Sequence, residues 1–145
     1  MFLVSNPLNS AYKDLMDLAF DLCDEFILVV RKDGGLYLSE NGMNVLNLIS
    51  HSLIVVEEDY KWPGTEIIGA VALVYHYKTN ELTKKIIKES ANSLHDWVQP
   101  NLPEDLCFIK KGVPWLINTS HEQETYINTE DSEEIYKVSS ILTLL

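Results

Sequence analysis

One cysteine and one histidine stand close enough along the chain to suggest a nucleophile and its base. Cys107 and His121 both belong to the segment 102–126. A thiol needs a nearby base or a positive field before it becomes a reactive thiolate. Glu122 or Glu124 could orient the imidazole. These residues define one function hypothesis, a small thiol-dependent hydrolase.

The neighbours of Cys107 favour a structural thiol instead. Leu106 and Phe108 flank it, as in a buried strand where cysteine acts as a small hydrophobe. No glycine-rich turn follows it to supply the backbone N–H groups of an oxyanion hole. We therefore predict that Cys107 is buried, that no residue is catalytic and that the chain is not an enzyme.

The other motifs predict no cofactor and no metal. His51, His76, His95 and His121 stand on four different expected elements, and no two of them have the spacing of metal ligands. The segment HEQET at 121–125 lacks the second histidine of a HExxH zinc motif. Neither GxGxxG nor GxxxxGK[ST] occurs, so no phosphate loop is expected.

The charge balance is the unusual global property. Asp and Glu number 22 against 11 Lys and Arg, which gives a formal net charge of −11. A negative field repels phosphate backbones, which argues against nucleic-acid binding. The same field could steer a basic protein partner, or it could serve solubility alone.

Size and cysteine content predict one domain, 1–145, in the cytoplasm. The 145 residues match the common size of a single domain. Cys23 and Cys107 are too few for a disulfide framework. The N-terminus lacks the basic start and apolar run of a signal peptide. The longest apolar run, 67–77, is shorter than the roughly 20 residues that span a bilayer, so no membrane contact is expected.

Hydrophobic periodicity and turn residues predict the elements. Helices are expected at 10–24, 39–50, 80–98 and in the final segment 129–145, and strands at 26–30, 36–38, 53–56, 67–77, 106–109, 115–118 and 125–127. Ser39, Asn80 and Asp131 or Ser132 are the expected N-caps. Helices and strands come in blocks, which predicts an α+β fold: a mainly antiparallel sheet of about five or six strands with three or four helices packed mostly on one face.

Helical spacing also predicts which side chains face the core. In the second helix these are Met43, Leu46 and Ile49, and in the third they are Leu82, Ile86, Leu94 and Trp97. Trp97 is expected to be a large core anchor.

The loop EEDYKWPGTE, 57–66, has the composition of a protein-binding surface. Acids surround two aromatic residues, and aromatic anchors within a polar rim are typical of binding hot spots. The alternative for Trp62 is that it folds back over the core as a lid. A second acidic group comprises Glu122, Glu124, Glu130, Asp131, Glu133 and Glu134. The predicted partner-binding residues are Glu57, Glu58, Asp59, Tyr60, Trp62, Glu66, Glu122 and Glu124.

Three segments carry a resemblance to known proteins: KWPGT at 61–65, LHDWVQPNLPEDLCF at 94–108 and GVPWLINTSHE at 112–122. Together they resemble a family of small, acidic, uncharacterised bacterial proteins, over roughly the second half of the chain. Its character is similar to that of the immunity proteins of bacterial toxin systems, which are small, acidic, cytosolic and free of cofactors. The resemblance implies no reaction and no catalytic residue.

The leading hypothesis is therefore an immunity or antitoxin-type protein that occludes the active cleft of a basic toxin domain. Electrostatic steering would speed the capture. The alternatives are the hydrolase built on Cys107 and His121, and a structural or stress-associated protein without catalytic activity. The identity of the partner and the oligomeric state stay open.

Overall fold

A computed structural model describes residues 1–142. In chain order its helices and strands are α1 (Ser10–Leu22), β1 (Glu25–Val30), α2 (Glu40–Leu48), β2 (Leu53–Asp59), β3 (Lys61–Trp62), β4 (Thr65–Glu66), β5 (Ala72–Lys78), α3 (Glu81–Ser90), β6 (Glu104–Lys110), β7 (Val113–Thr119), β8 (Glu124–Ile127) and α4 (Ser132–Leu142). Short 3-10 turns lie at Asp33–Gly35, Ser50–Ser52, Leu94–Asp96 and Ser120–Glu122. The last three residues of the predicted final segment lie outside the described residues.

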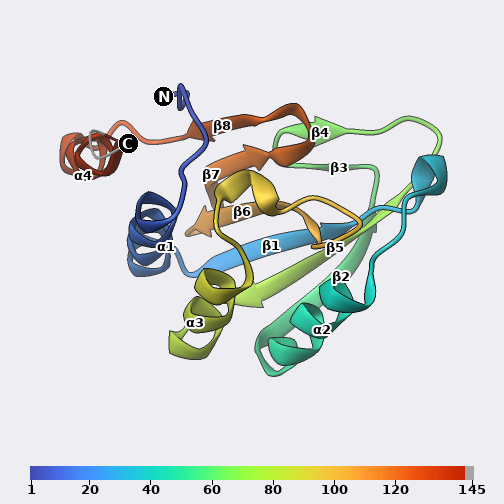
Figure 1. Cartoon of the computed structure of the whole chain (residues 1–145). Coiled ribbons are helices and arrows are strands. Elements are labelled where there is room, and N and C mark those ends of the chain that lie inside the picture. The colour runs from blue at the N-terminus through green and yellow to red at the C-terminus, as the bar shows by residue number, and fades with distance from the viewer. Residues whose placement is uncertain (143–145) are drawn as a thin grey trace.

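Six strands form one antiparallel sheet in the order β2-β5-β1-β6-β7-β8. The short strands β3 and β4 pair only with each other. In Figure 1, α1, α2 and α3 lie on one side of the sheet, the β3–β4 hairpin lies on the other, and α4 lies beyond α1. This arrangement confirms the predicted α+β class with an antiparallel sheet and helices mostly on one face.

The larger core fills the space between the helices and the sheet. Phe26 stacks on Tyr77 with ring centroids 5.2 Å apart and also contacts the ring of Phe108. Trp97 is fully buried, as predicted, and its indole N–H donates to the hydroxyl of Tyr12 at 3.0 Å. That hydroxyl donates in turn to the carbonyl of Ile87 on α3. Because each buried polar atom in this chain of bonds has a partner, the aromatic core carries no unsatisfied donor there.

A smaller core lies on the opposite face of the sheet. It consists of the buried residues Ile27, Val29, Trp62, Ala72, Val74 and Cys107. The β3–β4 hairpin covers this face. Burial of Cys107 confirms its predicted place in a strand interior.

The predicted N-caps of three helices are confirmed. Ser39 accepts a hydrogen bond from the N–H of Gly42 at the start of α2. Asn80 and Thr83 form a reciprocal capping box on α3. Asp131 accepts bonds from two N–H groups in the first turn of α4. Each of these bonds satisfies an amide that the helix itself leaves free.

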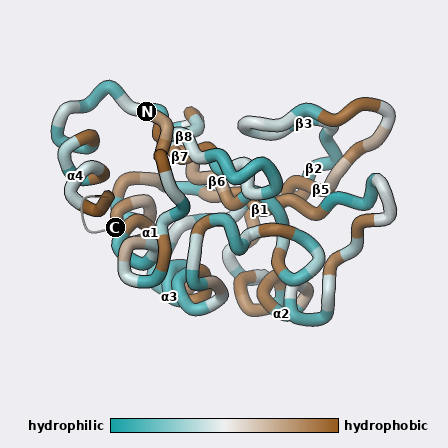
Figure 2. The backbone as a smooth tube through the Cα atoms, turned by 45° about the horizontal axis from the view of Figure 1, so that its top comes forward, coloured by the Kyte–Doolittle hydropathy of each residue, from teal (hydrophilic) through white to brown (hydrophobic). Residues whose placement is uncertain are grey.

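Three predicted elements are wrong: one strand is absent, one strand begins later and one helix ends earlier than predicted. No strand forms at 36–38, because Ser39 bonds to the carbonyls of Pro100 and Asn101 and so draws this segment away from β1. The strand predicted at 67–77 begins only at Ala72, after Gly69 adopts a φ of 76°. Figure 2 shows this hydrophobic stretch in the loop that leads from the β3–β4 hairpin to β5.

The third error is the length of α3, which ends at Ser90 instead of continuing to 98. The carboxylate of Asp96 accepts bonds from the N–H groups of Asn92 and Ser93. Such side-chain bonds compete with the helix ladder and favour a turn. Two inward side chains were also predicted wrongly: Met43 is 56% exposed and Leu82 is 49% exposed.

None of the helices within residues 1–142 combines the length and the apolar composition that a membrane crossing requires.

Candidate functional site

The two edge strands of the sheet, β8 and β2, differ in the backbone hydrogen bonds on their outer sides. At the β8 edge, the N-terminal residues add backbone hydrogen bonds: Leu3 donates to Thr125, and Ile127 donates to Met1. At the opposite edge, β2 pairs with β5 on its inner side, and no described strand pairs with its outer side. The outer edge of β2 therefore leaves a row of backbone donors and acceptors open to solvent.

The side chains of β2 divide into an apolar half and an acidic half. Leu53, Ile54, Val55 and Val56 are 38% to 52% exposed, and Glu57, Glu58 and Asp59 follow directly. Natural proteins protect an open edge with lysine, proline, bulges or a very short strand. β2 has a bulge between Leu53 and Val55 and ends in three acids, but its seven residues contain neither lysine nor proline. Beyond the bulge, the pairing of Val55 to Asp59 with β5 is regular, and this stretch is suited to pairing with another extended segment.

An apolar pocket of about 640 Å³ adjoins β2 on the helix side of the sheet. It is lined chiefly by Leu36, Tyr37, Met43, Leu53, Leu73 and Tyr75. Leu53 belongs to both the pocket and the open edge, so a chain that pairs with β2 can place a side chain in the pocket.

The predicted partner-binding residues fall into two separate groups. Glu57, Glu58 and Asp59 lie on β2, Tyr60 follows at 48% exposure, and Glu66 lies on β4 opposite Lys61. Glu122 and Glu124 lie beside and on β8, at the far end of the sheet. The structure thus brings the first five together and separates the last two from them.

Trp62 does not lie on this surface. It is 6% exposed, packs in the smaller core, and its Nε1 donates to Oδ2 of Asp105 at 3.0 Å. Of the two alternatives for Trp62, the structure shows the lid over the core and removes the exposed anchor. The cause is the hairpin, whose turn at Gly64 lies so close to β7 that a Cβ there would be 2.6 Å from Oγ1 of Thr119.

Sequence reasoning missed a pair of buried carboxylates at the start of β6. On β1, Val29 pairs with Glu104, and Ile27 pairs with Cys107. The two pairing residues are two positions apart on β1 but three positions apart on β6. This extra residue in β6 is a β-bulge, and Asp105 within it has a φ of 54°. A bulge can re-aim a side chain. Here it lets two consecutive carboxylates, 2% and 0% exposed, reach the same imidazole.

That imidazole belongs to His121. Its Nδ1 lies 3.3 Å from Oε2 of Glu104 and 3.4 Å from Oδ1 of Asp105. Backbone amides hold the carboxylates in place, because Gln99 donates to Oε1 of Glu104 and Ser120 donates to Oδ1 of Asp105, both at 2.9 Å. Oε2 of Glu104 accepts no hydrogen bond from any described residue.

The protonation of this pair is shifted by its surroundings. Burial raises the pKa of Glu104, and the neighbouring charge of Asp105 adds to the rise. Burial likewise raises the pKa of Asp105, although the bonds from Trp62 and Ser120 oppose the shift. A raised pKa means that burial favours the neutral carboxyl, so an ionised pair at this place needs a positive charge beside it.

Cys107 and His121 do not form a nucleophile and base. The thiol contacts the backbone N–H of Asn118 at 3.4 Å and its carbonyl at 3.7 Å, whereas His121 faces the two carboxylates. Burial raises the pKa of Cys107 to about 12. A thiol in this state is neither accessible nor ionised near neutral pH. The geometry gives the hydrolase hypothesis no support.

One member of the second acidic group is internal. Glu134 on α4 accepts hydrogen bonds from Lys110, from the indole of Trp115 and from the hydroxyl of Thr129. Burial alone would raise the pKa of Glu134, but these three bonds outweigh it and lower the pKa to about 2. Glu134 therefore anchors α4 to β6 and β7.

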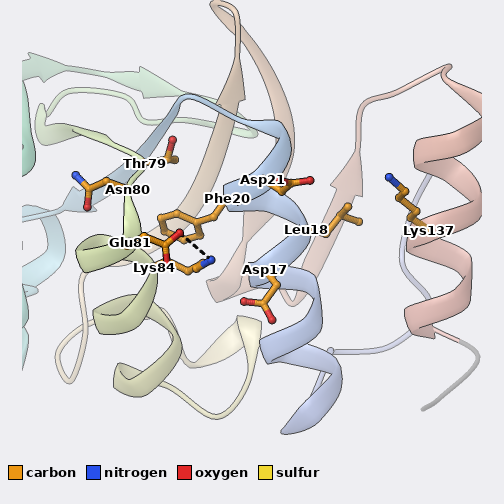
Figure 3. Close-up of a pocket in the computed structure, with 9 residues that line it drawn as sticks. All are labelled: Asp17, Leu18, Phe20, Asp21, Thr79, Asn80, Glu81, Lys84 and Lys137. Carbon is orange, nitrogen blue, oxygen red and sulfur yellow. Dashed lines mark ion pairs between the residues drawn. The ribbon is translucent and has the colours of Figure 1, made fainter.

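A large cavity of about 780 Å³ lies beside α1 and is lined by residues from α1, α3 and α4 (Figure 3). Its charged side chains are largely paired: Glu81 with Lys84 at 3.2 Å, and Asp17 with Lys88 at 2.7 Å. Lys137, seen across α1 in Figure 3, pairs with Glu133 at 3.4 Å. The lining offers mixed, neutralised charge and no convergent set of reactive groups.

Comparison of the chain with protein families, with curated proteins and with solved structures finds no match. The resemblance of 61–65, 94–108 and 112–122 to small acidic bacterial proteins therefore stays a prediction. The candidate site is defined by the open β2 edge, its acidic half and the adjoining pocket.

Proposed function

We propose that this chain is a protein-binding domain that pairs the β2 edge with an extended, basic segment of its partner. The observation that carries the proposal is the contrast between the two sheet edges: the N-terminal residues bond to β8, whereas no strand within residues 1–142 pairs with the outer side of the seven residues of β2. In the cell the activity fits an immunity or antitoxin-type protein that occludes a basic toxin domain in the cytoplasm.

The two halves of β2 have different tasks in this mode of binding. Addition of a strand gives affinity through backbone hydrogen bonds, and pockets for alternate side chains give specificity. Leu53 and the adjoining apolar pocket would receive an apolar side chain. Glu57, Glu58 and Asp59 would pair with lysine or arginine in the same segment.

A second copy of the chain fits this edge less well than a basic partner. Antiparallel self-pairing centred on Val56 would set Glu57 opposite Val55 and Glu58 opposite Ile54, so carboxylates would meet apolar side chains. Pairing of the two apolar halves would leave the acids unmatched. Each copy also carries a net charge of −11, so two copies repel each other.

The overall charge contributes to the rate of capture. A field of one sign raises the rate at which an oppositely charged protein arrives, and salt weakens the effect. Of the two aromatic residues in the segment 57–66, Tyr60 is 48% exposed at the end of β2 and is available for contact, whereas Trp62 is buried.

The proposal is tested by photo-crosslinking in the cells that express the chain. A photoreactive amino acid replaces Val55 on β2, and a matched control replaces Leu82, which is also apolar and exposed but lies on α3. We expect a crosslink from position 55 to a partner peptide with net positive charge, and none to that peptide from position 82. Crosslinks from position 55 only to a second copy of the chain, or to an acidic peptide, would overturn the proposal.

A further inference from the structure

The bulge in β6 assembles three metal-binding groups at one point on the hairpin side of the sheet. The ligand atoms of Glu104, Asp105 and His121 all lie within 4.8 Å of one another. We propose that these three residues bind one divalent transition-metal ion, for which Zn²⁺ is the representative probe. The site is distinct from the β2 edge and does not depend on the proposed function.

The spacing of the donor atoms fits such an ion. Zinc binds carboxylate oxygen and imidazole nitrogen at about 2.0–2.2 Å, so neighbouring ligands in a tetrahedral site lie about 3.3–3.6 Å apart. Nδ1 of His121 is 3.3 Å from Oε2 of Glu104 and 3.4 Å from Oδ1 of Asp105. The two carboxylate oxygens lie within 4.8 Å of each other, so binding of the ion requires a side-chain rotation that brings all three atoms to this spacing.

An independent observation points to a ligand at this place. Oε2 of Glu104 is buried, and no described residue donates a hydrogen bond to it. A buried polar atom without a partner is costly and uncommon in folded proteins. Nδ1 of His121 lies 3.3 Å from this oxygen without a hydrogen bond between them, so a metal ion bound by both atoms would supply the missing partner.

The remaining atoms of the ligands are already oriented. Oε1 of Glu104 accepts the N–H of Gln99, and Oδ2 of Asp105 accepts the indole N–H of Trp62. Oδ1 of Asp105 accepts the N–H of Ser120 at 2.9 Å and has a second lone pair to offer a metal ion. Metal-binding side chains in proteins are held by such outer hydrogen bonds, which fix the direction of the free donor atom. The β3–β4 hairpin, through Trp62, thereby contributes to the site.

The donor set selects the class of ion. Imidazole with carboxylate suits zinc and related transition metals, whereas Mg²⁺ and Ca²⁺ prefer a fuller shell of oxygen ligands. A divalent charge balances the two buried carboxylates. The positive charge of Arg31 also favours the ionised carboxylates, but its guanidinium bonds directly to Asp33 through Nε and a terminal nitrogen. The side chain of His121 is 28% exposed, so the site opens to solvent and a water molecule can complete the coordination.

The test is calorimetric titration of the full chain, first stripped of metal with a chelator, with Zn²⁺ and separately with Mg²⁺. We expect one Zn²⁺ per chain and no saturable Mg²⁺ binding. Glu104→Gln and His121→Gln should each weaken Zn²⁺ binding more than tenfold, since the loss of an outer partner alone costs about 10–100-fold. Glu104→Gln keeps the oxygen that accepts the Gln99 bond, and His121 is a surface position, so both variants are expected to fold.

The matched control is His76→Gln. His76 is the other histidine that contacts two carboxylates, those of Glu25 at 2.6 Å and Glu57 at 3.6 Å. Its replacement should leave the affinity for Zn²⁺ unchanged. Cobalt substitution gives a second readout, because a visible absorption band should appear with the wild-type chain and disappear with Glu104→Gln.

Three results would overturn the proposal. The first is the absence of saturable Zn²⁺ binding. The second is unchanged binding by both Glu104→Gln and His121→Gln. The third is loss of binding in His76→Gln, which would place the ion at the other histidine.

Discussion

The indole of Trp62 donates a hydrogen bond to Oδ2 of Asp105 at 3.0 Å, and both residues are buried. The bond joins the β3–β4 hairpin to the bulge at the start of β6. It explains why an aromatic residue in an acidic, turn-rich segment lies inside the protein. It also makes the hairpin part of the support for the carboxylate pair.

Replacement of Trp62 by Phe should destabilise the metal-free chain by about 1–3 kcal/mol, because the substitution leaves a buried carboxylate oxygen without its donor. The free energy of unfolding is measured in urea with a chelator present. In an Asp105→Asn background the same replacement should cost less, since the charged acceptor is already gone. An equal cost in both backgrounds would mean that packing alone explains the effect.

Gly64 allows the hairpin to lie close to β7. It has a φ of 85°, and a Cβ there would be 2.6 Å from Oγ1 of Thr119. Gly64→Ala should therefore destabilise the protein by about 1–3 kcal/mol from backbone strain, with a further cost from the steric clash. Gly69→Ala is the matched control, because Gly69 has a φ of 76° and nothing within 4 Å of the added Cβ. If the two variants unfold at the same urea concentration, the hairpin does not depend on this close approach.

The sequence predicted the β6–β7–β8 meander and three helix caps because these features depend on local patterns. Alternating apolar residues, the Lys110-Lys111-Gly112 turn and the capping side chains of Ser39, Asn80 and Asp131 all act within a few residues. The errors at 36–38, 67–71 and 91–98 have other causes. Bonds from Ser39 to 100–101, the left-handed Gly69 and the Asp96 side chain decide those segments.

The carboxylate pair could not be predicted from strand periodicity. Regular alternation places consecutive residues on opposite faces of a sheet, so Glu104 and Asp105 are expected to diverge. The bulge that re-aims them depends on pairing with β1, 75 residues or more earlier in the chain. The signal that was present is the pair of acids directly before the apolar run of 106–109. The position of β2 at the edge of the sheet could not be predicted from the sequence either, because long-range pairing sets the order of the strands.

Glu134 should make stability depend on pH in a defined window. Its ordinary pKa of 4.5 is lowered to about 2 in the folded chain. A lowered pKa means that the folded state favours the ionised carboxylate, so the stabilisation is complete above pH 4.5 and is lost as the pH falls towards 2. Urea midpoints of the wild type and of Glu134→Gln should differ at pH 7 and converge as the pH falls below 4.5. A difference that stays constant down to pH 3 or grows in acid would contradict the assignment.

The acids of β2 should govern the rate of partner capture more than the rate of release. Changing Glu57, Glu58 and Asp59 together to their amides removes three charges. The amide at position 59 still has an oxygen to accept the turn bonds that Asp59 now accepts from Tyr60 and Lys61. Exposed charges mainly set association rates. The association rate should fall and lose much of its salt dependence, and the dissociation rate should change less.

The control for this prediction is the amide variant of Glu122 and Glu124, at the far edge of the sheet. It should leave both rates nearly unchanged. An equal fall in the association rate for the two variants would mean that the net charge of the chain, and not the acids of β2, governs capture.

Amide hydrogen exchange of β2 tests the central claim most directly. Exchange is followed for the whole chain, free and bound to the partner identified by crosslinking from position 55. The outer amides of β2 have no partner strand in the described structure, so addition of a strand must slow their hydrogen exchange on binding. The exchange rates of the α1 amides should not change. Unchanged exchange in β2 together with protection at another surface would contradict binding at the β2 edge.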